Sequence, residues 1–338
     1  MDECLADLAG GVDEVEREPE DEVASPLARH RVFDALTWLT LRLGRLGPVR
    51  RAIARHMEAR IRARANAPAS RLRHPPAVEQ DKVALGLALL GAAERGLARG
   101  QLGAPALRAM LRNLYSGVFV HRGGASAKNR FRARHGQTPG DFLVISPGKA
   151  CNLRCHGCYA NSGAHRERLD WASFERLVRE AHDTWGTRVF VISGGEPLAW
   201  RDRGRSVLDL AERFPDCFFV MYTNGTLIDD AVAKRMGRLG NVSPALSVEG
   251  MREGTDARRG EGVFDKVLAA TDRLRREGVI IGVSLTATRE SADEILSDEV
   301  VETFFDGRGA SYAFVFHYMP IGRSYTLDLM MTPEQRLR

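Results

Sequence analysis

The sequence predicts an α/β fold in its C-terminal part, where six short apolar runs alternate with segments of helical character. The expected strands are residues 142–145, 188–192, 217–222, 243–248, 279–286 and 312–318, and the expected helices are residues 171–185, 205–213, 229–239, 263–277 and 293–305. Strands that alternate with helices are typical of parallel βαβ units. We therefore expect one parallel sheet of six strands that starts near residue 141.

Glycines, cysteines and polar residues gather where the predicted strands end. A cysteine-rich loop follows the first strand, residues 193–197 follow the second, and residues 223–225 follow the third. Glu249 ends the fourth strand, and His317 ends the sixth. Because parallel strands place their carboxyl ends on one rim, these residues are expected to form one site.

The composition narrows the class of protein. The chain has 338 residues, 44% of them apolar, which is enough for one large domain with an appendage. Five cysteines, three of them in one motif, indicate a metal site in a reducing compartment and exclude a secreted disulfide framework. No apolar run reaches the roughly 18 residues of a membrane span, and the acidic N-terminus excludes a signal peptide. We expect a cytoplasmic protein that can contact a membrane peripherally.

Residues 1–140 divide by charge. Residues 1–28 carry ten acidic side chains against one arginine, which predicts a disordered acidic tail. Residues 29–140 are expected to form a helical extension. Its first part, residues 29–64, has apolar residues at helical spacing among many arginines, with a break at Gly47-Pro48. Three prolines in residues 67–76 indicate a linker, and residues 125–139 read as a polar stretch before the first strand.

The basic segment 29–64 has more than one interpretation. Basic amphipathic helices with aromatic residues can lie in an anionic membrane interface. A helix packed on the domain with a solvated arginine face would show the same pattern. Nucleic-acid binding is not expected, because no recognised motif accompanies the basic charge.

The cysteine loop carries the most specific signal. Cys151, Cys155 and Cys158 have the spacing C-x3-C-x2-C directly after the first predicted strand. Three thiolates can ligate three irons of a cubane cluster and leave the fourth iron open to a small molecule. A closed structural metal site usually takes four protein ligands, and no fourth cysteine lies nearby.

These motifs together resemble the radical S-adenosylmethionine (radical SAM) superfamily. The resemblance covers about residues 141–325, and it is carried by CNLRCHGCYA after the first strand and by GGEP after the second. It implies a partial (β/α)6, TIM-like barrel over residues 141–338. Residues 255–265 are similar to SPASM/twitch-type members, which commonly carry further cysteines after the barrel. No cysteine follows Cys217 here, so this chain is either truncated at its C-terminus or lacks that extension.

The resemblance implies a role for each matching residue. The three cysteines would bind a [4Fe-4S] cluster whose open iron is chelated by SAM. Gly194, Gly195 and Glu196 would receive the SAM amino group. Ser247 and Glu249 would meet its ribose or carboxylate side, and Arg258 or Arg259 would pair with its carboxylate.

The catalytic residues and the substrate are not identified by the sequence. His317 and Tyr318 end the last strand and are candidates for moving a proton, with core packing as the alternative. The substrate is expected to be a lipid, a peptide or a small metabolite, and a one-electron donor of the flavodoxin or ferredoxin type is implied. The competing hypothesis is a non-enzymatic scaffold that binds zinc or an iron-sulfur cluster.

Overall fold

The computed structural model of the chain describes residues 38–39, 42–43, 46–65, 75–115 and 127–338. The predicted acidic tail and nearly all of the predicted linker lie outside these residues, as does most of the helix expected before Gly47. Among the described residues, the expected break at Gly47-Pro48 is where the first long helix begins. A helix also begins at Pro76, the last position of the predicted linker.

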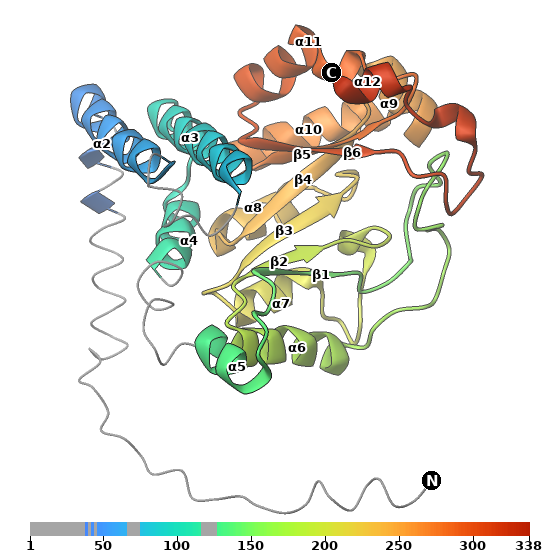
Figure 1. Cartoon of the computed structure of the whole chain (residues 1–338). Helices are drawn as coiled ribbons and strands as arrows, with labels where there is room; N and C mark the ends of the chain where they lie inside the picture. The colour runs from blue at the N-terminus through green and yellow to red at the C-terminus, as the bar shows by residue number, and fades with distance from the viewer. Residues whose placement is uncertain (1–37, 40–41, 44–45, 66–74, 116–126) are drawn as a thin grey trace, which may run out of the picture.

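The predicted α/β class is confirmed. Six strands form one parallel sheet in the order β1-β2-β3-β4-β5-β6. The strands are β1 Phe142–Ile145, β2 Val189–Ile192, β3 Phe218–Thr223, β4 Val242–Val248, β5 Gly282–Ala287 and β6 Tyr312–His317. Helices cover one side of the curved sheet and leave the other side open, as in a half barrel (Figure 1).

The helices connect the strands and extend the chain at both ends. Their bounds are α2 Gly47–Ala65, α3 Pro76–Ala98, α4 Ala104–Tyr115, α5 Ala127–His135, α6 Trp171–Glu180, α7 Val207–Arg213, α8 Asp230–Leu239, α9 Arg252–Arg259, α10 Val263–Arg276, α11 Asp298–Val301 and α12 Pro333–Leu337. Short π-helical segments, η3 Ala181–Trp185 and η6 Glu302–Gly307, continue α6 and α11. The single helix expected over residues 293–305 is therefore divided into a 3-10 turn, α11 and η6.

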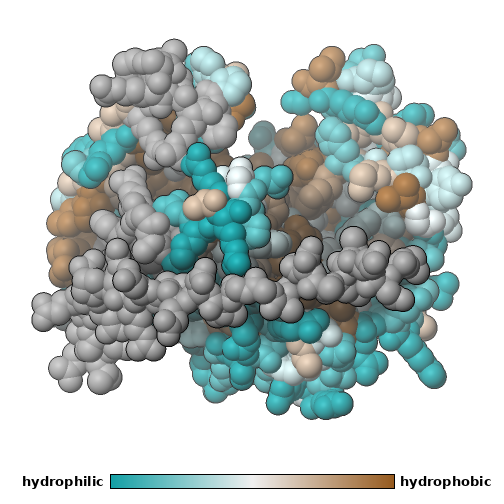
Figure 2. Space-filling view, turned by 60° about the horizontal axis from the view of Figure 1, so that its bottom comes forward, coloured by the Kyte–Doolittle hydropathy of each residue, from teal (hydrophilic) through white to brown (hydrophobic). Residues whose placement is uncertain are grey.

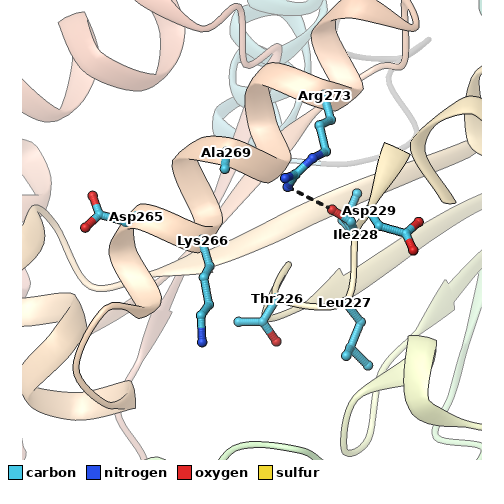
Figure 3. Close-up of a pocket in the computed structure, with 8 residues that line it drawn as sticks. All are labelled: Thr226, Leu227, Ile228, Asp229, Asp265, Lys266, Ala269 and Arg273. Carbon is cyan, nitrogen blue, oxygen red and sulfur yellow. Dashed lines mark hydrogen bonds between the residues drawn. The ribbon is translucent and has the colours of Figure 1, made fainter. Parts of the chain in front are cut away.

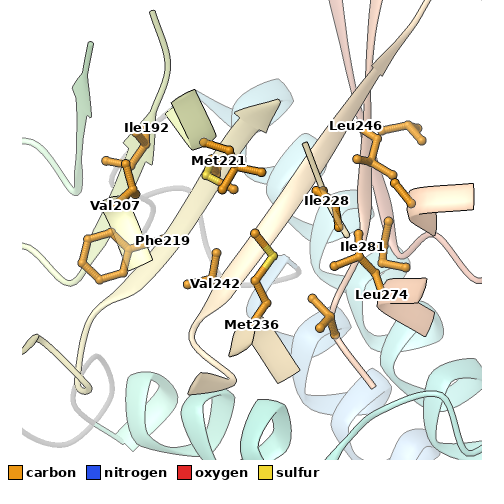
Figure 4. Packing of buried hydrophobic residues seen from close by; sticks show 14 of the residues in the cluster. Ile192, Val207, Phe219, Met221, Ile228, Met236, Val242, Leu246, Leu274 and Ile281 are labelled. Atoms are coloured by element: carbon orange, nitrogen blue, oxygen red, sulfur yellow. The ribbon is translucent and has the colours of Figure 1, made fainter. Parts of the chain in front are cut away.

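The hydrophobic core lies between the sheet and these helices. Alternate strand residues point into it, because successive side chains of a strand face opposite sides of a sheet. Phe219 and Met221 on β3 and Leu246 on β4 are fully buried there (Figure 4). Their strand neighbours Val220 and Tyr222 point to the open side instead.

The helical extension is joined to the core by close backbone contacts. Gly103 donates a backbone hydrogen bond to Gly278, and a β-carbon at Gly240 would overlap the backbone of Pro105. Helices α2 and α3 form an antiparallel pair, since Arg50 binds Glu94 at 2.7 Å near one end and Ile61 packs on Gly86 further along. This pair stands beside the half barrel (Figure 1).

Two helices, α5 and α9, were missed at the sequence level. Helix α5 occupies part of the stretch that reads as polar, and its side chains are mostly arginine and other polar residues. Phe131 holds it in place, because its ring packs edge-on against Trp185 of η3 with 6.3 Å between ring centres. A single tertiary contact of this kind leaves no periodic apolar signal in the sequence.

Exposed apolar side chains include several on the α2/α3 pair and on β6. Hydrophobic residues appear at the outer edge of the molecule and in the hollow at its centre (Figure 2). Ile53, Leu85 and Leu89 are exposed on the α2/α3 pair, whereas Phe314 and Phe316 are exposed on β6. Within the described part of the chain, no helix combines the length and the apolar character that crossing a membrane requires.

A polar cluster ties η3 to the start of β3, at the rim opposite the cysteine loop. His182 Nε2 lies 2.9 Å from Asp216 Oδ2, and Arg188 lies 3.3 Å from the same carboxylate. The adjacent Cys217 thiol is fully buried, and burial raises its pKa. The positive charge of Arg188 beside the Asp216 carboxylate disfavours a metal cation in this cluster. We therefore interpret the cluster as an ion pair that holds the rim together.

The stabilisation that His182 gives should therefore be present at acidic pH and be lost as pH rises above neutral. Its hydrogen bond to Asp216 raises the pKa of His182 above 6.5, against the effect of burial. A raised folded-state pKa stabilises the fold fully below the unfolded value and loses this effect as pH rises through the folded value. As pH rises through the folded-state pKa of His182, we expect the free energy of unfolding of the wild type to fall by about 1 kcal/mol more than that of His182→Gln. Urea denaturation at several pH values measures this, and His56→Gln on exposed α2 should keep the wild-type dependence.

Candidate active site

The three cysteines of the motif lie together on the loop that follows β1. All three are free thiols and partly buried. The loop is fixed at both ends by backbone hydrogen bonds, from Cys151 to Gly163 at 2.9 Å and from Arg323 to Cys158 at 3.0 Å. Burial raises the pKa of the Cys151 thiol, and the Leu153 backbone N–H partly opposes this. The loop thus holds three thiols at the carboxyl rim of the sheet.

The glycines after β2 let a second loop press against the cysteine loop. A β-carbon at Gly195 would overlap the Ala150 carbonyl, and one at Gly194, where φ is +104°, would meet the Gly148 carbonyl at 2.6 Å. Gly195 and Glu196 donate backbone hydrogen bonds of 2.9 and 2.8 Å to the same two carbonyls. Both glycines are therefore required by loop-to-loop packing, whatever they contact besides.

Glu196 lies beneath this junction with its carboxylate almost fully buried. The backbone N–H of Leu198 and the Thr223 hydroxyl donate to one oxygen at 3.0 and 2.7 Å, and the Asn224 N–H donates to the other at 2.8 Å. Burial raises the pKa of Glu196, and these hydrogen bonds act against it. The side chain thus links the ends of β2 and β3, and its predicted contact with a ligand amino group remains a prediction.

Asn224 extends the junction to the cysteines. Its Nδ2 donates to Asn152 at 2.9 Å and lies 3.9 Å from Cys151 Sγ. Thr226 is bonded to Asn152 and to Asn224 in turn. Sequence reasoning missed Asn152, because an asparagine between cysteines carries no distinctive spacing. Thr223 was expected at this rim from its place at the end of the third strand.

A buried ionic group lies on the other side of the cysteine loop from this junction. Glu249 at the end of β4 accepts hydrogen bonds from Arg258 at 2.5 Å and from Arg259, and its other oxygen accepts the Thr286 N–H at 3.2 Å. Burial acts against the charge on Arg259, but the Glu249 carboxylate outweighs it and the pKa of Arg259 is raised. Both arginines that were predicted to bind a carboxylate of the ligand are thus paired with Glu249 in this structure.

Arg258 also contacts the cysteine loop. Its carbonyl accepts the His156 N–H at 2.9 Å, and its guanidinium donates to the His156 and Gly157 carbonyls at 3.2 and 3.4 Å. The charge of Arg259 acts on Cys155 and Cys158. A guanidinium beside thiolate ligands would offset part of the negative charge of a metal cluster. The three cysteines, this cation and the lack of a fourth nearby cysteine among the described residues all fit a cluster held by three thiolates.

The two candidate residues at the end of the last strand lie in different surroundings. Tyr318 is buried, with its ring against Gly157 and its hydroxyl accepting the Thr326 N–H at 3.3 Å. His317 is exposed and follows Phe316, so strand alternation points it to the other side of the sheet. Neither side chain is shown reaching a substrate. Ser247 lies on the open side of β4, and its contact with the ribose or carboxylate side of SAM remains a prediction.

A pocket of about 520 Å³ lies between the loop after β3 and α10, and Thr226 of the polar junction is one of its lining residues. Lys266 and Arg273 enter it from α10, facing Thr226 and Asp229 on the loop (Figure 3). Arg273 already donates to the Ile228 carbonyl at 3.3 Å. No cysteine lines this pocket, so we place the candidate site at the cysteine loop.

Comparison with known proteins agrees with this geometry. Residues 145–297 match the family model described as the radical SAM superfamily. The Fe-coproporphyrin III synthase of Methanosarcina barkeri is 30% identical over 156 residues, covering 45% of this chain and 38% of that protein. The sporulation killing factor maturation protein SkfB of Bacillus subtilis is 29% identical over 155 residues, covering 45% of this chain and 37% of the relative.

The fold agrees with a solved structure as well. The crystal structure of Streptococcus suis SuiB bound to S-adenosylmethionine aligns with a TM-score of 0.50 and 20% identity, over 61% of this chain and 47% of that one. This similarity shows the fold alone. The chain spans less than half the length of the two curated relatives just described.

Gly157 gives a test of the packing around the cysteine loop. Its φ is +62°, and an added β-carbon would lie 2.8 Å from Tyr318 Cε2. We expect Gly157→Ala to destabilise the chain by about 1–3 kcal/mol and to lower its iron content after anaerobic reconstitution. Gly100→Ala is the matched control, since its φ is +64° but nothing lies within 4 Å. Equal iron content in the two variants would contradict the packing argument.

Proposed function

We propose that this chain is a radical SAM enzyme that cleaves S-adenosylmethionine reductively, because residues 145–297 match the radical SAM superfamily model. The observation that carries the proposal is the contact between the cysteine loop and the loop at Gly194 to Glu196. Three thiols and a glycine-lined, hydrogen-bonded turn lie side by side on one rim.

Each residue would contribute a definite part. Cys151, Cys155 and Cys158 would hold a [4Fe-4S] cluster, and Arg259 would stabilise its negative charge. The bound cofactors would supply one electron and a 5′-deoxyadenosyl radical for hydrogen abstraction from the substrate. The turn at Gly194 and Gly195 would offer backbone carbonyls to the SAM amino group. Glu196 would hold that turn in place.

The Glu249 group would receive the opposite side of SAM. Arg258 and Arg259 have guanidinium groups that suit a carboxylate, and Ser247 offers a hydroxyl on the open side of the sheet. For a carboxylate to bind there, one arginine would share its donors between Glu249 and the ligand. Five N–H donors on each guanidinium allow this.

The relatives are named for different substrates, so they do not point to one substrate class. One relative is named as an Fe-coproporphyrin III synthase and another as a peptide maturation protein. We propose a small organic molecule or a peptide as substrate, with a flavodoxin- or ferredoxin-type protein as the electron donor.

Reconstitution tests the activity. With iron, sulfide, dithionite and SAM under anaerobic conditions, the wild-type chain should form 5′-deoxyadenosine. Cys155→Ser should lower the rate by at least about 100-fold, because a cluster ligand is lost. Cys217→Ala removes a buried thiol at the opposite rim and should retain activity. A correctly formed cluster that yields no 5′-deoxyadenosine would support the scaffold hypothesis instead.

We also propose that the α2/α3 pair contacts an anionic membrane surface. Helix α2 carries six arginines against Glu58 alone. Helix α3 adds a run without polar side chains, residues 83–93, with Leu85 and Leu89 exposed by 61% and 51%. Basic charge beside exposed apolar groups favours the headgroup boundary of a bilayer.

Co-sedimentation with vesicles tests this contact. The triple variant Arg51→Ala, Arg55→Ala and Arg60→Ala should weaken binding to phosphatidylserine vesicles at least about tenfold, since each surface arginine contributes roughly 1 kcal/mol. The control variant Arg132→Ala, Arg134→Ala and Arg176→Ala removes the same charge from α5 and α6 and should bind as wild type. Equal weakening by both variants would mean that net charge, not this surface, determines binding.

A further inference from the structure

The open side of the sheet carries no charged side chain on any of its six strands. Its residues are those that alternate with the buried core residues, and they are apolar, small or hydroxylated. Ala245 on β4 and Gly282 on β5 are in register with each other and with Tyr312 on β6. Small residues therefore line the middle of this side, with larger ones at its margins.

Aromatic rings gather over the small residues. Tyr222 on β3 packs edge-on against Phe314 and Phe316 on β6, with ring centres 5.5 and 5.4 Å apart. Two strands separate β3 from β6, so these contacts require the sheet to curve toward this side. We name Tyr222, Phe314 and Phe316 the aromatic wall.

The aromatic wall is only partly covered. Phe314 and Phe316 keep 37% and 43% of their surface exposed. Below them, Tyr312 fills the space over Gly282 and shares a 2.7 Å hydrogen bond with Ser243. The lower end of the open side is thus closed by Tyr312, and the exposed ring faces lie above it.

The aromatic wall is adjacent to the proposed cofactor site. Tyr222 directly precedes Thr223, whose hydroxyl binds Glu196. Phe316 is in register with Thr286, whose N–H binds Glu249. Burial, together with the neighbouring Tyr159 of the cysteine loop, raises the pKa of Tyr222 to about 12. A molecule on the aromatic wall would therefore lie next to the cysteine loop.

We propose that the aromatic wall binds the substrate and that the substrate presents a flat, uncharged ring system to it. This inference rests on the proposed function, whose substrate class it narrows. Partly exposed rings gain from stacking against another ring. A charged group in the same place would lose its water without finding a partner, because the strands offer none. Polar groups of the substrate would lie at the rim, near Ser247 and Thr286.

Two dyes that differ by one charge test the inference on the full chain. N-phenyl-1-naphthylamine is uncharged, and 1-anilino-8-naphthalenesulfonate is the same ring system with one sulfonate. We expect the uncharged dye to bind at least tenfold more tightly, measured by fluorescence titration. Phe316→Ser should weaken its binding about tenfold, whereas Val315→Ser, on the same strand but the opposite side, should not.

The outcomes separate the inference from the proposed function. Unchanged dye binding in Phe316→Ser, or equal loss in Val315→Ser, would overturn the aromatic wall as a binding surface. Tighter binding of the sulfonated dye would overturn its selectivity for uncharged rings. Wild type and Val315→Ser should both form 5′-deoxyadenosine from SAM without substrate. A wild-type chain that binds the uncharged dye but never cleaves SAM would disprove the enzymatic function alone.

Discussion

The contact between two neighbouring loops is the constraint on which the site depends. The turn at Gly194 and Gly195 packs so closely on the carbonyls of Gly148 and Ala150 that no side chain fits between them. Backbone hydrogen bonds from Gly195 and Glu196 hold this packing. The end of β2 is thereby fixed to the loop that carries the cysteines. Parallel neighbouring strands make the contact possible, because both loops leave the sheet at the same rim.

Two buried carboxylates complete the site in different ways. Glu196 is held by neutral donors from β2 and β3, whereas Glu249 is held by two guanidinium groups. Burying an ion is costly unless its lone pairs are filled, and both residues meet that condition with three hydrogen bonds or more. Arg258 then connects the second carboxylate to the cysteine loop. The loop is therefore supported from two sides by separate polar networks.

The open side of the sheet contrasts with this charged rim. The rim offers arginines, carboxylates and thiols, while the strands below it offer only apolar, small and hydroxyl groups. Such a division suits a reaction in which a polar cofactor lies above an apolar part of the substrate. The α2/α3 pair stands apart from both regions, and its arginines and exposed leucines suit a different contact.

The sequence by itself determined the six strands and the place of the chemistry. Alternating apolar runs and loop residues at strand ends depend only on local pattern, so the strands, the cysteine loop and the turn at Gly194 were predictable. Helix α5, the packing of Tyr318 on Gly157, the pairing of both arginines with Glu249 and the aromatic wall were not. Each of these joins residues that lie far apart in the chain or on strands whose curvature is set by the whole sheet. Only the tertiary structure decides such contacts, because they depend on how the strands and loops are brought together in space.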